Sequence, residues 1–207
     1  MAAKDATTAA PIDFYFEFAS PYGYFASLRI DRVAARHDRT VAWRPFLLGA
    51  VMKITGMAPF GSIPVRRDYF RRDVPRLARA YGMTVTMPDS MPMNGVAACR
   101  AFYWLVDEDP ESAKHLARAV YDAHWREGRD MGDGEAVAEV ATNYGIDREA
   151  LLAGIQEPAV KQRLKDETDA AVAAGVFGSP YLIIDGEPFW GQDRLKEAER
   201  WLETGGW

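Results

Sequence analysis

Apolar side chains alternate with polar or tyrosine side chains along residues 12–18, near the start of the chain. An alternation with period two predicts a β-strand, because successive side chains of a strand point to opposite faces of the sheet. Ser20 and Pro21 follow and are typical of a helix start, with Ser20 as the N-cap and Pro21 in the first helical position. Apolar residues then recur at helical spacing as far as His37, and residues 40–46 are predicted to form a second strand.

The middle of the chain, from Leu47 to Ala174, has no pattern typical of a strand. It contains amphipathic segments that are separated by proline and glycine residues. Pro75 falls inside the first of these segments, so we expect that helix to be kinked or divided in two. The predicted helices span residues 64–81, 95–106, 111–126, 134–143, 148–153 and 157–174.

Period-two patterning returns near the C-terminus. Residues 181–184 and 187–190 flank Asp185 and Gly186, a pair that strongly favours a two-residue hairpin turn. A last amphipathic helix is predicted at residues 194–202. The order βαβ, helices, ββα predicts an α/β protein with a thioredoxin-like fold and an all-helical domain inserted after the second strand. We expect a disordered N-terminus at residues 1–10, a thioredoxin-like domain at 11–48 and 175–207, and the inserted helical domain at 49–174.

Composition narrows the classes of function. The 207 residues are 48% hydrophobic and 27% charged, which is typical of a globular protein with its own core. A net charge of -5 argues against the broad basic face of a nucleic-acid binder. No apolar run is long enough to span a membrane, and the N-terminal residues lack the apolar segment of a secretory signal. We therefore expect a cytoplasmic protein without nucleic-acid or membrane partners. The single cysteine, Cys99, excludes an intrachain disulfide and a zinc site of several thiolates, and we expect no metal.

A thioredoxin-like fold places its chemistry at the turn after the first strand, where helix N–H groups and the helix dipole favour an anion. This turn has the sequence SPYG at residues 20–23. Without cysteines it cannot work as a dithiol–disulfide oxidoreductase. Two interpretations of Ser20 follow: a helix cap, or a hydroxyl that donates to the thiolate of a cofactor such as glutathione.

Two segments near the C-terminus could serve the same site. Pro180 stands where thioredoxin-like folds usually carry a cis-proline that faces the active turn. The backbone of the preceding Ser179 could then pair with an extended thiol tripeptide; otherwise the segment is an ordinary turn. Backbone N–H groups around Gln192 and Asp193 could bind a carboxylate, and the Asp193 carboxylate could bind an ammonium group. Glutathione has both groups at its γ-glutamyl end, although Asp193 could simply cap the last helix.

Other polar residues receive plainer interpretations. Cys99 lies in an apolar helical segment and is predicted to be a buried small hydrophobic residue. The arginine-rich run at residues 66–79 is a solvated helix face or, less favoured, a wall that attracts anionic substrates. Lys53 could pair with a substrate carboxylate or remain exposed.

The segments DFYFEFASPYGYFA and VFGSPYLIIDGEPFWGQDRL, with PFLLGAVMKITG between them, resemble the 2-hydroxychromene-2-carboxylate isomerase family. That family is related to the kappa-class glutathione transferases and, more distantly, to the DsbA-type oxidoreductases. The resemblance extends over residues 12–202. It implies that Ser20 contacts the glutathione sulfur, and that Ser179, before the matching cis-proline Pro180, binds the cysteinyl backbone. It also implies that Gln192 and Asp193 hold the γ-glutamyl group.

The same resemblance implies a substrate pocket with Lys53 as a basic residue and Asn94 as a polar one. Two positions depart from the family pattern. Met57 stands where relatives often carry an asparagine, which removes one polar contact to glutathione or substrate. Ser179 replaces the commoner valine or leucine, a change that leaves a role of the backbone intact.

The implied activity is that of a glutathione-dependent isomerase. The thiolate adds reversibly to an aromatic, pyruvate-like carboxylate substrate, a bond rotates, and elimination returns the thiol. Relatives are often dimers, so we expect a homodimer. Two alternatives remain open: a kappa-class-like glutathione transferase or peroxidase that consumes the thiol, and a non-enzymatic thioredoxin-like binding module.

Overall fold

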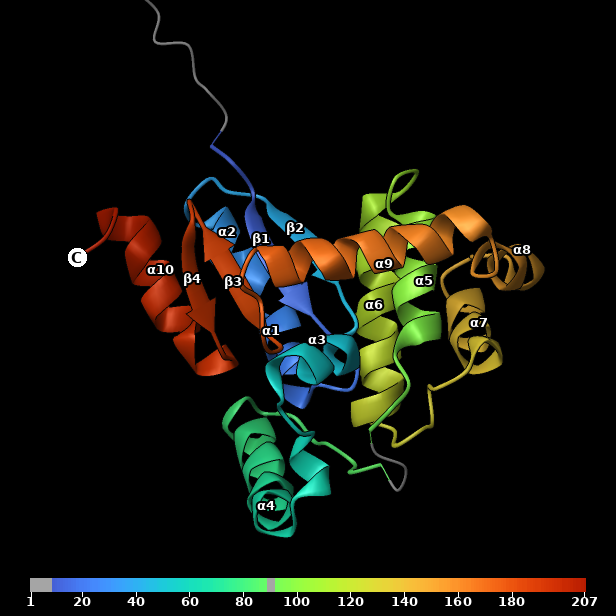
Figure 1. Ribbon diagram of the computed structural model, residues 1–207, viewed down its shortest axis with the longest axis horizontal. Coiled ribbons are helices and arrows are strands. Elements are labelled where there is room, and N and C mark those ends of the chain that lie inside the picture. The colour runs from blue at the N-terminus through green and yellow to red at the C-terminus, as the bar shows by residue number, and fades with distance from the viewer. Residues whose placement is uncertain (1–8, 89–91) are drawn as a thin grey trace, which may run out of the picture.

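A single mixed sheet organises the computed structural model, which describes residues 9–88 and 92–207 (Figure 1). Its four strands have the order β2-β1-β3-β4. β1 pairs in parallel with β2 and antiparallel with β3, and β3 pairs antiparallel with β4. The strands are β1 (Ile12–Phe16), β2 (Val41–Pro45), β3 (Tyr181–Ile184) and β4 (Glu187–Trp190). The predicted order of strands is therefore confirmed, while residues 1–8 of the predicted disordered N-terminus lie outside the described residues.

Both faces of the central strand β1 are buried. Phe14 and Phe16 lie on one face, where they pack edge-on against Trp43 of β2. Tyr15 lies on the opposite face, next to Phe46 and below the helix α9 (Pro158–Ala173), which crosses the sheet in Figure 1. Because α9 covers this second face, Tyr15 is buried, whereas Asp13 near the start of the strand stays partly exposed in its ion pair with Arg44.

The helix predicted after β1 is divided into two. α1 (Pro21–Ser27) ends before Leu28, and α2 (Ile30–Ala35) begins after Arg29. The Ser27 hydroxyl donates to the Tyr24 carbonyl oxygen at 2.7 Å, which gives that carbonyl a partner outside the helical ladder. The continuous helix expected as far as His37 is wrong in this respect.

One helix was not expected, and another, expected to be kinked or divided in two, is not divided. α3 (Leu48–Thr55) follows β2 and ends at Gly56, whose φ of 71° is the left-handed conformation that favours glycine. Val51 is its one buried residue, so its sequence lacks a clear apolar stripe. α4 (Pro64–Ala80) continues through Pro75 as one helix.

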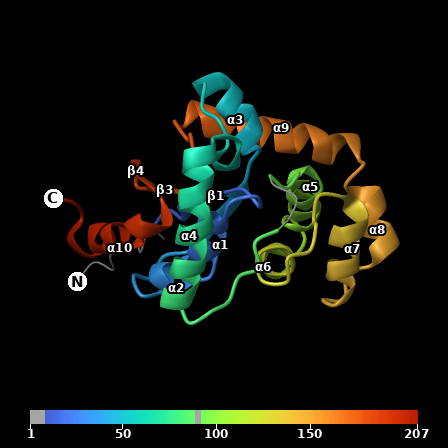
Figure 2. The ribbon, with the colours of Figure 1, turned by 90° about the horizontal axis from the view of Figure 1, so that it is seen from below.

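The remaining helices begin and end within two residues of their predicted bounds. Figure 2 shows α5, α6, α7 and α8 gathered on one side of the sheet, with α10 and the C-terminus on the other. Among the described residues, no helix is long and apolar enough to cross a membrane. These elements are α5 (Val96–Leu105), α6 (Pro110–Trp125), α7 (Gly134–Thr142), α8 (Arg148–Gly154) and α10 (Leu195–Thr204), with 3-10 turns η1 (Phe60–Ser62) and η2 (Gln192–Arg194).

Candidate active site

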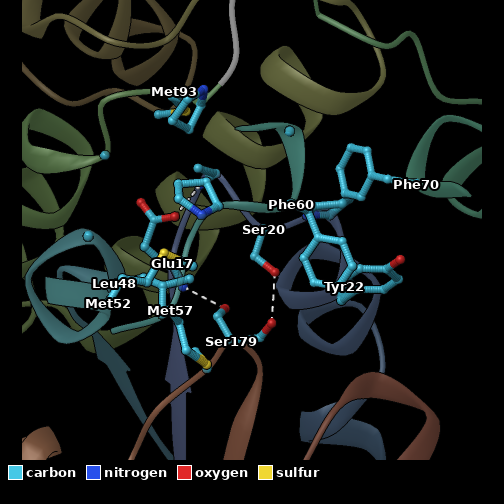
Figure 3. A pocket seen from close by; sticks show the side chains of 18 of the residues that line it. Glu17, Ser20, Tyr22, Leu48, Met52, Met57, Phe60, Phe70, Met93 and Ser179 are labelled. Atoms are coloured by element: carbon cyan, nitrogen blue, oxygen red, sulfur yellow. Dashed lines mark hydrogen bonds between the residues drawn. The ribbon is translucent and has the colours of Figure 1, made fainter. Parts of the chain in front are cut away.

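A cavity of about 940 Å³ opens at the end of β1, between α1, α3, α4 and the loops on either side of the β3–β4 hairpin. Its wall is mainly apolar (Figure 3). Of the residues predicted for the site, all but Pro180 line the cavity. They are Ser20, Lys53, Asn94, Ser179, Gln192 and Asp193. The apolar wall includes Leu48, Met52, Met57, Phe60, Phe70 and Met93.

Ser20 is the N-cap of α1, and its hydroxyl makes two hydrogen bonds. The oxygen accepts from the Gly23 N–H at 3.0 Å, which is the capping bond. The hydroxyl proton is donated to the backbone carbonyl of Ser179 at 2.9 Å (Figure 3). Capping therefore uses the acceptor side of the hydroxyl and leaves its donor side for another partner.

The peptide bond between Ser179 and Pro180 is cis, as the position of Pro180 predicts. The Ser179 hydroxyl accepts from the Glu17 N–H at 2.9 Å, so this loop is bonded at two points to the turn between β1 and α1. The Pro180 carbonyl accepts from the Gly191 N–H at 3.0 Å, which ties the loop to the turn after β4. The turn after β1 and the two ends of the β3–β4 hairpin thus meet at the cavity.

Two side chains of α6 donate hydrogen bonds to the backbone of the turn after β1. The Tyr121 hydroxyl donates to the Glu17 carbonyl at 2.9 Å, and the Trp125 indole donates to the Phe18 carbonyl at 3.1 Å. A Cβ atom at Gly23 would stand 2.6 Å from the Tyr121 hydroxyl and 2.9 Å from the Ser179 hydroxyl. Only glycine at this position allows α1 to approach so closely.

Gln192 and Asp193 lie in η2, directly before α10. The N-cap positions of η2 and α10 belong to Gly191 and Arg194, so Asp193 does not occupy the cap position that the plainer interpretation gave it. The Gln192 carboxamide oxygen accepts from the Tyr81 hydroxyl at 2.5 Å, and Arg29 in turn donates to Tyr81 at 3.1 Å. With its oxygen occupied, the Gln192 amide has its NH2 group left to donate to a ligand. Tyr81, at the C-terminal end of α4, was not predicted for the site, because no local pattern marks it.

Lys53 and Asn94 line the cavity at exposed positions. Lys53 lies in the last turn of α3, and the Asn94 side chain accepts from the Val96 N–H at 3.3 Å, at the start of α5. Of the arginine-rich run, Arg66 also lines the cavity, with its guanidinium 4.1 Å above the Phe60 ring. The cavity therefore has cationic groups beside its apolar wall.

Tyr22 and Asp73 were not predicted to belong to the site. The Tyr22 hydroxyl donates to Asp73 at 2.8 Å and so joins α1 to α4. Burial, followed by the hydrogen bond to Asp73, raises the pKa of Tyr22 and keeps the phenol neutral. Arg76 pairs with the same carboxylate.

Glu17 is the second unpredicted member. It is only 6% exposed, yet it lines the cavity directly before the turn that carries Ser20. Burial raises the pKa of its carboxyl from 4.5 to about 8, against hydrogen bonds from the Ala19 and Phe18 N–H groups that lower it. Cys99, in contrast, is buried in α5 and does not line the cavity, and burial raises the pKa of its thiol. Across the described residues no group of three or more His, Cys, Asp or Glu could hold a metal ion.

A four-stranded sheet with a cis-proline loop facing the N-terminus of its first helix defines a thioredoxin-like protein. The family model described as DSBA-like thioredoxin domain matches residues 11–203, so the chain belongs to this family.

Similarity to individual proteins points to one branch of the family. The chain is 31% identical to a 2-hydroxychromene-2-carboxylate isomerase of Pseudomonas putida, over 89% of this chain and 90% of the relative. A solved structure of a 2-hydroxychromene-2-carboxylate isomerase superposes with a TM-score of 0.84 and 28% identity, covering 93% of this chain and 94% of that one. Human glutathione S-transferase kappa 1 is 25% identical over 92% of each chain. The predicted resemblance is confirmed.

Proposed function

We propose that this protein is a glutathione-dependent isomerase of aromatic, pyruvate-like carboxylates, of the 2-hydroxychromene-2-carboxylate isomerase type. In this proposal Ser20 holds the thiolate. Ser179 and Pro180 bind the cysteinyl backbone, and Gln192 and Asp193 hold the γ-glutamyl group. Lys53 and Asn94 contact the substrate. The predicted domain division, cytoplasmic location and homodimer remain proposals beside it.

The observation that carries this proposal is the bond between the Ser20 hydroxyl and the Ser179 carbonyl inside a cavity without a cysteine. The cavity has a donor for a sulfur anion and an acceptor for a peptide N–H, but no sulfur of its own. A thiol must therefore come from outside, and a cysteine-containing peptide matches both groups.

Binding of such a peptide exchanges partners without leaving any group unsatisfied. The cysteinyl N–H replaces the Ser20 hydroxyl on the Ser179 carbonyl, and the released hydroxyl turns to donate to the sulfur. A hydroxyl bond to a thiolate favours the ionised form and lowers the thiol pKa. The capping bond from Gly23 uses the acceptor side of Ser20 and is kept throughout.

The substrate class follows from the wall of the cavity. Leu48, Met52 and Phe60 offer apolar surface suited to an aromatic ring, and the thioether of methionine adapts to its shape. Lys53 and Arg66 provide positive charge for a carboxylate. Relatives named 2-hydroxychromene-2-carboxylate isomerase support this class of substrate.

In the reaction, the thiolate adds to a conjugated carbon of the substrate and turns a double bond into a single bond. Rotation about that bond and elimination of the thiolate give the isomer, with glutathione regenerated. The protein supplies a low-pKa nucleophile and orientation, while glutathione supplies the covalent chemistry.

Isothermal titration of glutathione tests the cofactor. We expect binding by the wild type and weaker binding by both Ser20→Ala and Asp193→Ala. An unaltered affinity in both variants contradicts the assigned site, and no binding at millimolar glutathione contradicts the cofactor itself.

A kappa-class-like transferase is the second candidate, supported by the similarity to glutathione S-transferase kappa 1. It uses the same site and consumes the thiol in a conjugate. Counting free thiol during turnover separates the two, because isomerisation leaves the thiol concentration unchanged.

A further inference from the structure

The Glu17 carboxyl is enclosed where an acid is costly to ionise. It follows the last residue of β1 and lies among the lining side chains in Figure 3, together with Leu48, Met52 and Met57. A charged carboxylate in such surroundings loses its hydration, and proteins compensate with a cation or leave the group neutral. No ion pair to Glu17 exists within residues 9–88 and 92–207.

The groups packed around this carboxyl are neutral. Its Oε2 accepts from the Ala19 N–H at 2.8 Å, and its Oε1 faces Gly95, where a Cβ atom would stand 2.2 Å away. Cys99 of α5 and Tyr121 of α6 are the nearby titratable groups, and burial raises the pKa of both. The carboxyl therefore has one oxygen anchored to the backbone and no charged neighbour to neutralise it.

The hydrogen bonds that connect the turn after β1 to distant segments do not involve the Glu17 side chain. The Glu17 backbone alone bonds the turn to its surroundings, because its N–H donates to Ser179 and its carbonyl accepts from Tyr121. The carboxyl adds only local bonds, from the N–H groups of Ala19 and Phe18. A buried acid that lines a cavity and is not needed for the framework is a candidate for proton transfer to whatever occupies the cavity.

We propose that Glu17 is the general acid and base of this site: it gives its proton to the substrate oxygen on which negative charge develops, and takes it back when the thiolate leaves. This role rests on the proposed function and assigns it a further catalytic residue.

The proton transfer balances within the reaction. Addition forms a carbon–sulfur bond and moves a π electron pair onto the conjugated carbonyl oxygen, which receives the proton of Glu17 and becomes an enol. The Glu17 carboxylate that remains is stabilised by the N–H groups of Ala19 and Phe18. After rotation, the carboxylate recovers the proton, the electron pair returns, the carbon–sulfur bond breaks, and the thiolate leaves. Nothing is oxidised or consumed.

The carboxyl is suited to both halves of this cycle. A pKa of about 8 keeps it protonated at neutral pH, ready to donate, and lies close enough to neutrality for the proton to return. A carboxylate in the resting site would also repel the thiolate that Ser20 is proposed to hold. The neutral acid avoids that repulsion.

The decisive variant is Glu17→Gln, which keeps the size and the acceptor for Ala19 and has no transferable proton. With 2-hydroxychromene-2-carboxylate and glutathione, we expect kcat to fall about 10²-fold while the Kd for glutathione changes less than twofold. The kcat of the wild type should fall as the pH rises through about 8, and that of the variant should be flat there. Asp13→Asn, in the adjoining strand β1 and paired with Arg44 away from the cavity, is the matched control and should keep both kcat and pH profile.

Infrared spectroscopy gives a readout that does not depend on turnover. The carbonyl band of a protonated carboxylic acid should be present in the wild type at neutral pH, disappear above the pKa of Glu17, and be missing in Glu17→Gln. Wild-type kcat and pH profile in the variant, or no such band, overturn the role of Glu17. If glutathione binds but the wild type does not convert 2-hydroxychromene-2-carboxylate, the proposed isomerase activity is contradicted. The carbonyl band then decides by itself whether Glu17 is a neutral acid. Without glutathione binding both proposals fall.

Discussion

The hydroxyl of Ser20 donates to the backbone carbonyl of Ser179 at 2.9 Å, across 159 positions of sequence. The two groups proposed to bind the thiol peptide satisfy each other. A buried hydroxyl or carbonyl without a partner is unfavourable, so this bond stabilises the site. It also holds both groups in the positions that the ligand needs.

Replacing Ser20 by alanine removes the cap of α1 and leaves the Ser179 carbonyl without its donor. We expect the free energy of unfolding to fall by about 1–2 kcal/mol and the affinity for glutathione to fall about tenfold. Denaturant unfolding and calorimetric titration measure the two effects. Asp147→Ala is the control, because Asp147 caps α8 in the same way through the Ala150 N–H at 2.7 Å. Equal losses of affinity in both variants would mean that Ser20 acts through stability alone.

Replacing Asp193 by alanine removes the proposed partner of the ligand's ammonium group. Because Asp193 is exposed, we expect a modest loss of glutathione affinity, about fivefold to tenfold. A glutathione analogue without the γ-glutamyl amino group should bind the wild type and the variant equally well. If the variant still binds glutathione better than this analogue, the ammonium group has another partner.

Replacing Tyr81 by phenylalanine frees the Gln192 carboxamide to rotate. Tyr81 then no longer holds the oxygen of Gln192, so the NH2 group is no longer directed to the ligand. We expect the Kd for glutathione to rise about threefold to tenfold, with kcat at saturating glutathione unchanged. Tyr144→Phe, an exposed tyrosine outside the cavity, should have no effect. A reduced kcat with unchanged Kd would contradict a positioning role.

The buried Glu17 carboxyl makes stability dependent on pH. Its pKa is about 8 in the folded protein against 4.5 normally, so between these values the folded state binds more protons than the unfolded state. Stability attributable to this group is therefore complete below about pH 4.5 and lost as the pH rises towards 8, at roughly 1.4 kcal/mol per pH unit. Glu17→Gln should lack this slope, so the free energy of unfolding of the variant relative to that of the wild type should rise by about 5 kcal/mol between pH 4.5 and 8. Chemical denaturation of both proteins at several pH values measures the difference, and parallel curves would contradict the raised pKa.

Local patterns were sufficient for the strands and for the hairpin. Asp185 and Gly186 both adopt positive φ, 52° and 91°, which is the reason that this pair signals a two-residue turn. The SPYG turn and Pro180 were predicted from the sequence because a thioredoxin-like fold has its active turn after the first strand and a cis-proline that faces this turn.

Burial by distant segments could not be predicted in the same way. Alternation along β1 placed Tyr15 and Glu17 on one face, but only the packing of α9 and α5 shows that this face is covered. α3 was not predicted because Val51 is its one buried residue, so its sequence has no apolar stripe. Tyr81 reaches Gln192 across 111 positions, a contact without any local signature.

In the proposed reaction, external glutathione is the nucleophile of an isomerase and is returned unchanged. The most direct test incubates the protein with 2-hydroxychromene-2-carboxylate and follows the substrate spectrum and the free thiol together, with and without glutathione. We predict rapid approach to equilibrium only when glutathione is present, at constant thiol concentration. Equilibration at the uncatalysed rate, or a loss of thiol that matches the substrate consumed, would contradict the account.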